Sequence, residues 1–512
     1  MDAFVLVPES YTGGAVWDGV AERLRAAGAE VHQVTLTGLG ERREEAGPET
    51  GLDTHVADLV RVIDAVEAPE LVLVGHGYGI HPALGAADLR SERIARIVYL
   101  DSGLPLDGES VLDLLPDPGV RDWLLQRAER TGAARLVPPP TLEEWPFGGS
   151  VAGVPAEALE RLVAAAAPQP LGTFTEPLRL TGKAADIPST GILCTAGGSS
   201  IAVVQMVLNM GEPRLQALVD PRVGFFELET GHWPMLSCPE ELAGVLLRAA
   251  AGEGQRLTAP TPSARPGTFL IDLPERPRER VGQLDLYLPD ERPDERPDER
   301  PGAGGPRPAV LFVHGGPFAA GKRPTPRDSA TFTGYGRYAA EQGLVGAVVD
   351  HPLHALGDFE RSAGEVAAAV EQLRADPRVD RDRIALWFFS GGGLLTADWL
   401  AAPPPWLRCL ALSYPLLAPL PNWGLARSRF RPAAAVDRSG PLPLVLTRVG
   451  LETPQIAATV AEFLDAATAA GVVVDVVDLA GGHHGFETID HTEEARQAVT
   501  RAFRAVREHL EG

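Results

Sequence analysis

Ile384-Ala385-Leu386-Trp387-Phe388-Phe389-Ser390-Gly391-Gly392-Gly393-Leu394-Leu395 is the stretch that decides the fold of this chain. An apolar run typical of a buried strand ends at Ser390, and glycines and a helix-forming segment follow at once. A serine between a strand and a helix sits on a sharp turn, which holds its hydroxyl clear of the sheet. The helix after the turn directs backbone N–H groups at a reacting oxygen. The stretch therefore predicts a nucleophilic serine, although Phe388 takes the place of the first glycine in the usual G-x-S-x-G pattern.

Two motifs further along the chain carry the groups that an attacking serine needs. Glu452 ends a Gly-Leu-Glu motif and His484 opens a His-Gly-Phe motif, and each motif follows a segment with the pattern of a strand. Serine is a poor nucleophile until a neutral imidazole takes its proton, and a carboxylate holds that imidazole in one tautomer. We therefore predict that Ser390, Glu452 and His484 act together. His483 is the alternative histidine, and His484 is favoured because it directly precedes Gly-Phe.

A third motif supplies candidate donors for an oxyanion. A buried strand over residues 309–314 ends in Gly315-Gly316-Pro317. Glycines at such a place let the backbone come close to a ligand and leave an N–H group free. Proline has no N–H group, so Gly316 is the better donor. We predict that Gly316 and Gly391 together form an oxyanion hole.

These motifs resemble those of α/β-hydrolases of the dienelactone-hydrolase, esterase and prolyl-oligopeptidase kind, and the resemblance covers about residues 265–512. It implies a mostly parallel sheet flanked by helices, with nucleophile, acid and histidine in that order along the chain. It also implies a serine hydrolase that cleaves carboxylic esters or lactones through an acyl-enzyme on Ser390. These families more often have aspartate at the acid position, but glutamate can orient an imidazole equally well.

Aromatic side chains near these motifs are candidates for a substrate pocket. Trp387 comes shortly before Ser390, Phe318 follows the glycine-rich loop, and Trp423 lies in a proline-rich insertion at about residues 414–440. An insertion of this kind can form a cap over an apolar acyl or aromatic group. We predict that these three aromatic residues line the pocket.

The first half of the chain, residues 1–250, alternates strand-like and helical segments, which is typical of a parallel sheet. Its motifs at residues 4–8, 75–79 and 231–235 resemble those of α/β-hydrolases of the plant-esterase and hydroxynitrile-lyase type. The resemblance implies a second α/β-hydrolase domain. The long Pro- and Leu-rich excursion that ends near residue 188 would be its cap insertion.

The same resemblance indicates that this first half has lost its nucleophile. Gly77 stands where the family has its serine, and Glu9 replaces a glycine that the family usually keeps beside the oxyanion hole. No carboxylate stands at the usual acid position. Asp101 could serve as a displaced acid, but it is interpreted in preference as a strand-end residue. Gly77 and His232 are therefore predicted to mark a degenerate site. The alternative is acid–base chemistry by His76 and His232 without a covalent step.

Composition predicts the boundaries between the two halves. Residues 251–267 are read as a linker, and residues 268–512 as the second domain. A Pro-Asp-Glu-Arg repeat within residues 289–308 has little apolar surface to bury, so we expect a loop there. Segments 268–273 and 282–288 are predicted to be the first two strands of the second domain.

Bulk properties exclude several classes of partner. The chain has 512 residues and a formal net charge of −23, which argues against nucleic acid or an anionic membrane surface. Three cysteines far apart argue against a disulfide framework and favour a reducing, cytoplasmic location. No Cys/His spacing typical of a metal site is found, so neither a metal nor a cofactor is expected. The expected partner is a small-molecule ester or lactone, and a homodimer is one assembly that the sequence allows.

The preferred interpretation is a tandem α/β-hydrolase with a catalytic second domain and a pseudo-hydrolase first domain that has a structural or docking role. One alternative keeps the chemistry of Ser390 but makes the chain an acyltransferase or a peptidase. Another makes the two halves a non-catalytic pair of binding modules. A third gives the first half a lyase role through His76 or His232.

Overall fold

The computed structural model describes residues 3–115, 118–132, 135–209, 213–259, 268–290, 305–318, 320–321, 323–425 and 428–512. These residues divide into two compact units. The first unit holds the described residues up to 259 together with residues 420–425, and the second holds those from 268 to 419 and from 428 to 512. Most of the predicted repeat loop and the end of the predicted linker lie outside the described residues.

The first unit is built on a six-stranded sheet in the order β2-β1-β3-β4-β7-β8. Its strands are β1 (Ala3–Val7), β2 (Glu30–Gln33), β3 (Leu71–His76), β4 (Ile94–Leu100), β7 (Ser189–Cys194) and β8 (Val223–Leu228). All neighbouring strands pair in parallel. Parallel strands covered on both faces are apolar throughout, and every residue of β1 and β3 is indeed buried. The carboxyl ends of the strands therefore meet at one edge of the sheet.

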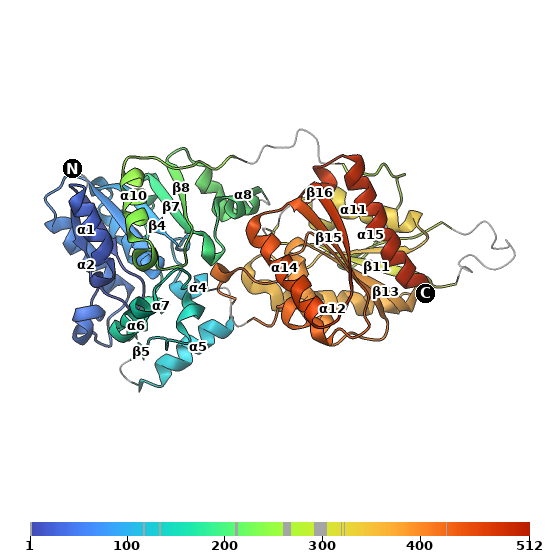
Figure 1. Cartoon of the computed structure of the whole chain (residues 1–512), viewed down its shortest axis with the longest axis horizontal. Helices are drawn as coiled ribbons and strands as arrows, with labels where there is room; N and C mark the ends of the chain where they lie inside the picture. Colours follow the sequence, from blue (N-terminus) through green and yellow to red (C-terminus); the bar gives the residue numbers. More distant parts are fainter. Residues whose placement is uncertain are drawn as a thin grey trace. The chain divides into compact units, whose positions relative to one another are not determined.

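Helices flank this sheet, as Figure 1 shows. α1 packs against α10, and α2 packs against α3. Their bounds are α1 (Asp18–Ala26), α2 (Leu52–Ala65), α3 (Ile80–Leu89), α8 (Ile201–Asn209), α9 (Pro234–Ser237) and α10 (Pro239–Ala250). The long insertion between β4 and β7 holds α4 (Val111–Leu114), α5 (Pro118–Glu129), β5 (Leu136–Val137), α6 (Ala156–Ala165), β6 (Gln169–Pro170) and α7 (Gly172–Thr175).

The second unit has an eight-stranded sheet in the order β16-β15-β14-β13-β11-β12-β10-β9. Its strands are β9 (Glu279–Val281), β10 (Leu284–Tyr287), β11 (Arg307–Val313), β12 (Val345–Val349), β13 (Val379–Phe389), β14 (Leu407–Ser413), β15 (Leu444–Leu451) and β16 (Val474–His483). The neighbouring strands in the part of the sheet that runs β16-β15-β14-β13-β11-β12 pair in parallel. β10 pairs antiparallel with both β12 and β9. The sheet is thus mostly parallel, as predicted.

The second unit contains the helices α11 (Ala330–Glu341), α12 (Phe359–Ala375), α13 (Thr396–Ala401), α14 (Pro454–Ala469) and α15 (Glu493–Glu511). Figure 1 labels α11, α12, α14 and α15. α15 packs on the strands β13 to β16, and its buried face includes Val499, Phe503 and Val506. The predicted insertion at 414–440 carries short 3-10 helices at Pro421–Trp423, Pro432–Ala434 and Val436–Arg438. No helix within the described ranges combines the length and the apolar character needed to cross a membrane.

One predicted strand at the start of the second unit is wrong. Residues 268–273 have no strand, although Leu270 is buried and its apolar neighbours pack against the core. The segment satisfies the burial that its sequence pattern demands without pairing to the sheet. The other predicted strand, at 282–288, is β10.

Candidate active site

Ser390 lies directly after β13, at the start of a short 3-10 helix that runs from Ser390 to Leu395. Its φ angle is 52°, in the left-handed region that non-glycine residues rarely adopt. Such strain persists only where the surrounding structure enforces it, and it is common at functional positions. Phe388, which departs from the usual motif, is fully buried and paired within the sheet, so the departure does not prevent the turn.

The loop after β11 packs closely against this turn. A Cβ atom built on Gly315 would lie 2.7 Å from the Cβ atom of Ser390, and one built on Gly391 would lie 2.2 Å from the carbonyl oxygen of Gly316. Both distances are shorter than real Cβ contacts, so glycine is required at Gly315 and Gly391. The predicted oxyanion residues, Gly316 and Gly391, are therefore neighbours beside Ser390.

The structure brings Ser390, His484 and Glu452 into one hydrogen-bonded chain. The distance from Ser390 Oγ to His484 Nε2 is 2.6 Å, and from His484 Nδ1 to Glu452 Oε2 it is also 2.6 Å. Glu452 follows β15 and is almost fully buried, and His484 follows β16. His483 instead faces the solvent, with Nδ1 2.9 Å from Asp490 Oδ1. The contact with Ser390 thus belongs to His484.

A buried carboxylate that the sequence did not reveal lies behind His484. The hydroxyls of Tyr335 and Tyr414 each donate to Glu487 at 2.9 Å, and the Tyr414 ring lies 4.8 Å from the His484 ring. Burial raises the pKa of Glu487 to about 7, although the tyrosine hydroxyls oppose this shift. The sequence signal that could have pointed to Glu487 is its position, three residues after His484 in a short turn.

The first unit has the same turn at the same place in its sheet. Gly77 follows β3 and has a φ angle of 50°. A Cβ atom built on Gly77 would lie only 1.3 Å from Glu9 Oε2. The carboxylate of Glu9 therefore occupies the space that a nucleophilic side chain at position 77 would need.

Glu9 is held in that space by backbone and side-chain donors. Ser10 N donates to Glu9 Oε1 at 2.6 Å, and Tyr78 N lies 3.0 Å from Glu9 Oε2. His232 Nε2 lies 3.1 Å from the same Oε2 atom. Burial alone would raise the pKa of Glu9, but the hydrogen bond and the charge of His232 outweigh it and lower the pKa to about 2. A permanent carboxylate thus fills this site.

Asp101 contacts the histidine of the first unit, because its Oδ2 atom lies 2.8 Å from His232 Nδ1. This contact matches the alternative of a displaced acid and corrects the preferred interpretation of a plain strand-end residue. Asp101 follows β4, the strand beside β3, and its φ angle of 40° turns it towards the site. Burial would lower the pKa of His232, but Asp101 and Glu9 raise it to about 10. The sequence signal for this role of Asp101 is its position directly after β4, the strand that pairs with β3.

Comparison with known proteins assigns the family. A profile of the Alpha/beta hydrolase family matches residues 4–245. The carbendazim hydrolyzing esterase of Nocardioides sp. (strain SG-4G) is 31% identical over 250 residues, which cover 48% of this chain and 97% of that protein. The chain belongs to the alpha/beta hydrolase family. Lipase LipV of Mycobacterium tuberculosis (strain ATCC 25618 / H37Rv) is 30% identical over 135 residues, which cover 25% of this hydrolase and 50% of the lipase.

Solved structures also include similar chains. An extracellular alpha/beta-hydrolase from a Paenibacillus species is 21% identical, with a TM-score of 0.41, and covers 49% of this hydrolase and 99% of its own chain. The methylesterase MES16 from Arabidopsis is 20% identical, with a TM-score of 0.37, and the coverage is 49% and 99%. The family profile spans the unit that has glycine in place of the serine.

The predicted pocket aromatics of this hydrolase fall in different environments. Trp387 is a correction: it is 1% exposed, its Nε1 donates to Ser413 Oγ at 2.9 Å, and it packs in the aromatic core with Phe503. Strand side chains alternate between faces, and this position faces the helix layer. Phe318 is half-buried beside His314, and Trp423 is half-buried in its short helix, so their role in a pocket stays a prediction.

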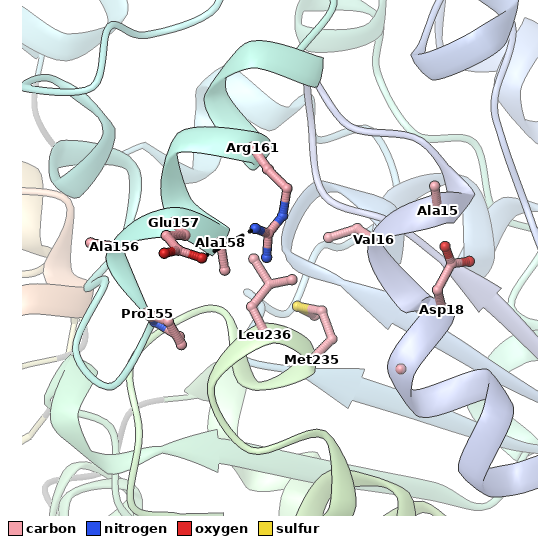
Figure 2. Close-up of a pocket in the computed structure, with 11 residues that line it drawn as sticks. Ala15, Val16, Asp18, Pro155, Ala156, Glu157, Ala158, Arg161, Met235 and Leu236 are labelled. Carbon is pink, nitrogen blue, oxygen red and sulfur yellow. Dashed lines mark ion pairs between the residues drawn. The ribbon is translucent and has the colours of Figure 1, made fainter.

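A hollow of about 670 Å³ lies on the first unit of the hydrolase, and Glu9, Gly77, Asp101 and His232 are not among its lining residues. Figure 2 shows Val16, Met235 and Leu236 at this hollow, with an ion pair between Glu157 and Arg161 at its side. Both charged side chains are largely exposed. The hollow offers no nucleophile or buried acid, so it supplies no site for chemistry.

One cluster of the hydrolase could hold a metal ion. Glu9, His76 and His232 offer ligand atoms that all lie within 4.8 Å of one another. His76 is fully buried, and burial lowers its pKa to about 4, so its imidazole is neutral. The sequence predicted no metal ligands, because the three residues are far apart in the chain: Glu9 follows β1, His76 ends β3 and His232 follows β8.

Proposed function

We propose that the chain is a carboxylic ester hydrolase that uses Ser390 as nucleophile, His484 as general base and Glu452 as the residue that orients the histidine. The observation that carries the proposal is the hydrogen-bonded chain of these three side chains at a strained turn. Relatives named as an esterase, a lipase and putative methylesterases suggest an ester as the substrate class of the family. The family profile matches the first unit, so the assignment of ester hydrolysis to Ser390 rests on the geometry of the three side chains.

In the proposed reaction, Ser390 Oγ attacks the ester carbonyl carbon while its proton passes to His484 Nε2. The carbonyl electron pair moves onto oxygen, and the tetrahedral oxyanion then collapses with loss of the alkoxide, which takes the proton from His484. A water molecule repeats the sequence on the acyl-enzyme and releases the acid and free Ser390. Glu452 holds His484 in the required tautomer and stabilises the imidazolium.

The first unit supports the assignment of the oxyanion donors. Gly79 and Gly392 are equivalent, because a Cβ atom on either would press on the carbonyl oxygen at the residue just after β1 or β11. By the same alignment, Ser10 corresponds to Gly316, and Tyr78 corresponds to Gly391. Ser10 N and Tyr78 N both donate to the Glu9 carboxylate. The N–H groups of Gly316 and Gly391 would hold the substrate oxyanion in the same manner.

The proposal includes a first unit that is a pseudo-hydrolase with a structural or docking role. Gly77 has no side chain to attack an ester, and Glu9 fills the place where the carbonyl oxygen would bind. His232 and Asp101 are paired as in a triad but have an acceptor, Glu9, instead of a hydroxyl. Serine hydrolysis by this unit is therefore blocked twice.

Labelling of the whole protein with a fluorophosphonate, followed by peptide mapping, tests the proposal. We expect one label per chain, on the peptide that contains Ser390, and none in Ser390→Ala. Hydrolysis of p-nitrophenyl acetate should be lost in the same variant. Ser91→Ala, the same change at a half-buried serine of the first unit, should keep both. A label that persists in Ser390→Ala would refute the assignment.

A further inference from the structure

The cluster of Glu9, His76 and His232 brings three elements of the first unit together. Glu9 follows β1, His76 ends β3, and His232 follows β8. The atoms His232 Nε2 and Glu9 Oε2 are 3.1 Å apart, and a ligand atom of His76 lies within 4.8 Å of both. His76 is fully buried, and the other two side chains are 10% and 14% exposed. The cluster is thus largely buried.

One ring nitrogen of His76 has no hydrogen-bond partner among the described residues. Its Nε2 atom lies 2.7 Å from the backbone oxygen of His232, so Nε2 carries the hydrogen and donates it. The neutral ring then has a lone pair on Nδ1, and among the described residues no group bonds to this atom. A buried polar atom without a partner is destabilising, and a bound ligand would remove that cost.

The outer contacts of both histidines match those of metal ligands. Histidines that bind metals usually donate their other ring N–H to a carboxylate or a backbone carbonyl, which fixes the ring and its tautomer. His232 has this contact with Asp101 at 2.8 Å, and His76 has it with the backbone oxygen of His232. This leaves two ring nitrogens for a ligand: His232 Nε2, which lies 3.1 Å from Glu9 Oε2, and the buried His76 Nδ1.

We propose that Glu9, His76 and His232 bind a divalent metal ion, with zinc(II) as the best match. Two imidazoles and one carboxylate are a common zinc ligand set, and they leave a fourth position for water. Tetrahedral ligands with bonds of about 2.1 Å are about 3.4 Å apart, close to the 3.1 Å between His232 and Glu9. The metal takes the place of the proton between them.

The charges of the site suit a doubly positive ion. Glu9 and Asp101 are both deeply placed carboxylates, and the positive partner that they share within the described residues is His232. Bringing His76 into the ligand sphere requires its ring or Glu9 to shift by about 1 Å, since 4.8 Å exceeds the usual ligand spacing. A bound ion would then join β1, β3 and the loop after β8, and it would stabilise the folded first unit.

Metal titration of the full-length protein tests this proposal. Protein treated with a chelator and dialysed is titrated with Zn²⁺ by calorimetry, and with Co²⁺ by its visible absorption. We expect one equivalent of each ion and the intense absorption of tetrahedral cobalt. Glu9→Gln and His232→Gln should lose this equivalent, and Asp101→Asn should weaken binding by about tenfold to a hundredfold.

His483→Ala is the matched control, because it removes an exposed histidine that faces a carboxylate, Asp490. This variant should bind metal as the unchanged protein does. Fluorophosphonate labelling of the second unit and circular dichroism check that each variant is folded. The proposal is overturned if the unchanged protein takes up no metal, or if Glu9→Gln and His232→Gln still bind one equivalent.

Discussion

Ser390 and Gly77 have nearly the same backbone conformation, with φ angles of 52° and 50°, but the residues that face them differ. Beside Ser390 stands Gly315, which has no side chain, and beside Gly77 stands Glu9, which has a long one. In each unit the space between the turn and the facing loop admits one side chain only. The side chain that fills this space determines whether the site presents a hydroxyl, as with Ser390, or a carboxylate, as with Glu9.

The two adjacent histidines give the first residue-scale prediction. His484→Ala should lower ester hydrolysis by at least about a thousandfold, because Ser390 then has no group to take its proton. His483→Ala should leave the rate unchanged, since its ring contacts Asp490 and not Ser390. The measurement is the turnover of p-nitrophenyl acetate by both variants. Equal losses in the two would mean that the histidines act together.

The blocked first site gives a second prediction. In the double variant Glu9→Gly with Gly77→Ser, the facing pair becomes the same as Gly315 and Ser390, and His232 and Asp101 are already in place. We expect a second fluorophosphonate label, on the peptide that contains position 77. Each single change should give none, because Gly77→Ser meets the Glu9 carboxylate and Glu9→Gly supplies no hydroxyl. A label in either single variant would contradict the complementary packing.

Some residues of the two sites could be predicted from the sequence, and others could not. Ser390, Glu452 and His484 each stand directly after a strand, and parallel strands bring such positions to one edge of the sheet. The partnership of Asp101 with His232 was only an alternative at the sequence level, because it joins positions 131 residues apart and depends on the order of the strands in the sheet. Glu487 was missed because its burial depends on two tyrosines from other elements.

At the scale of elements, strands and the loops at their carboxyl ends explain both sites. The strongly apolar runs were predictable, since only a strand covered on both faces is apolar throughout. Residues 268–273 show the limit, because the same burial can be reached without pairing to the sheet. Trp387 shows a second limit: proximity to the turn does not reveal which face of β13 a side chain takes.

Glu487 joins α11 to the end of β14 through two tyrosines, and its titration makes the packing of these elements depend on pH. Its pKa is raised from 4.5 to about 7 on folding, so the folded protein holds a proton that the unfolded chain releases. Stability is then greatest below the unfolded value and falls as pH rises from about 4.5 to 7.

Glu487→Gln should remove this fall. We expect the urea midpoint of the variant, relative to that of the unchanged protein, to increase as pH rises from 4.5 to 7. Above about pH 7 the difference between the two midpoints should be constant. Parallel midpoints across this range would show that Glu487 does not change its proton on unfolding. Any lost tyrosine contact shifts the difference equally at every pH and leaves the slope as the test.

At the scale of the whole molecule, the described core residues fall into separate clusters. The main cluster of the first unit draws on residues between 3 and 249, and that of the second on residues between 270 and 510. Each cluster has its own parallel sheet and its own turn, so each unit has the parts of an independent folding domain. The two-domain organisation was predictable from length, since one core rarely serves 512 residues.

Scanning calorimetry should accordingly show two unfolding transitions. Leu6→Ala and Phe312→Ala each remove a fully buried side chain, from the first and the second core respectively. Such changes cost about 2–5 kcal/mol, which lowers the midpoint of a domain of this size by roughly 5–15 °C. Each variant should move one transition and leave the other. A single transition that both variants lower would mean that the units unfold together.

The opposed glycines, Gly315 in one unit and Gly77 in the other, also bear on how the chain could change over generations. A serine placed at position 77 would meet Glu9, and a glycine placed at position 9 alone would leave nothing to attack an ester. Neither mutation by itself would give selection a working site, so a nucleophilic serine in the first unit requires two coincident mutations.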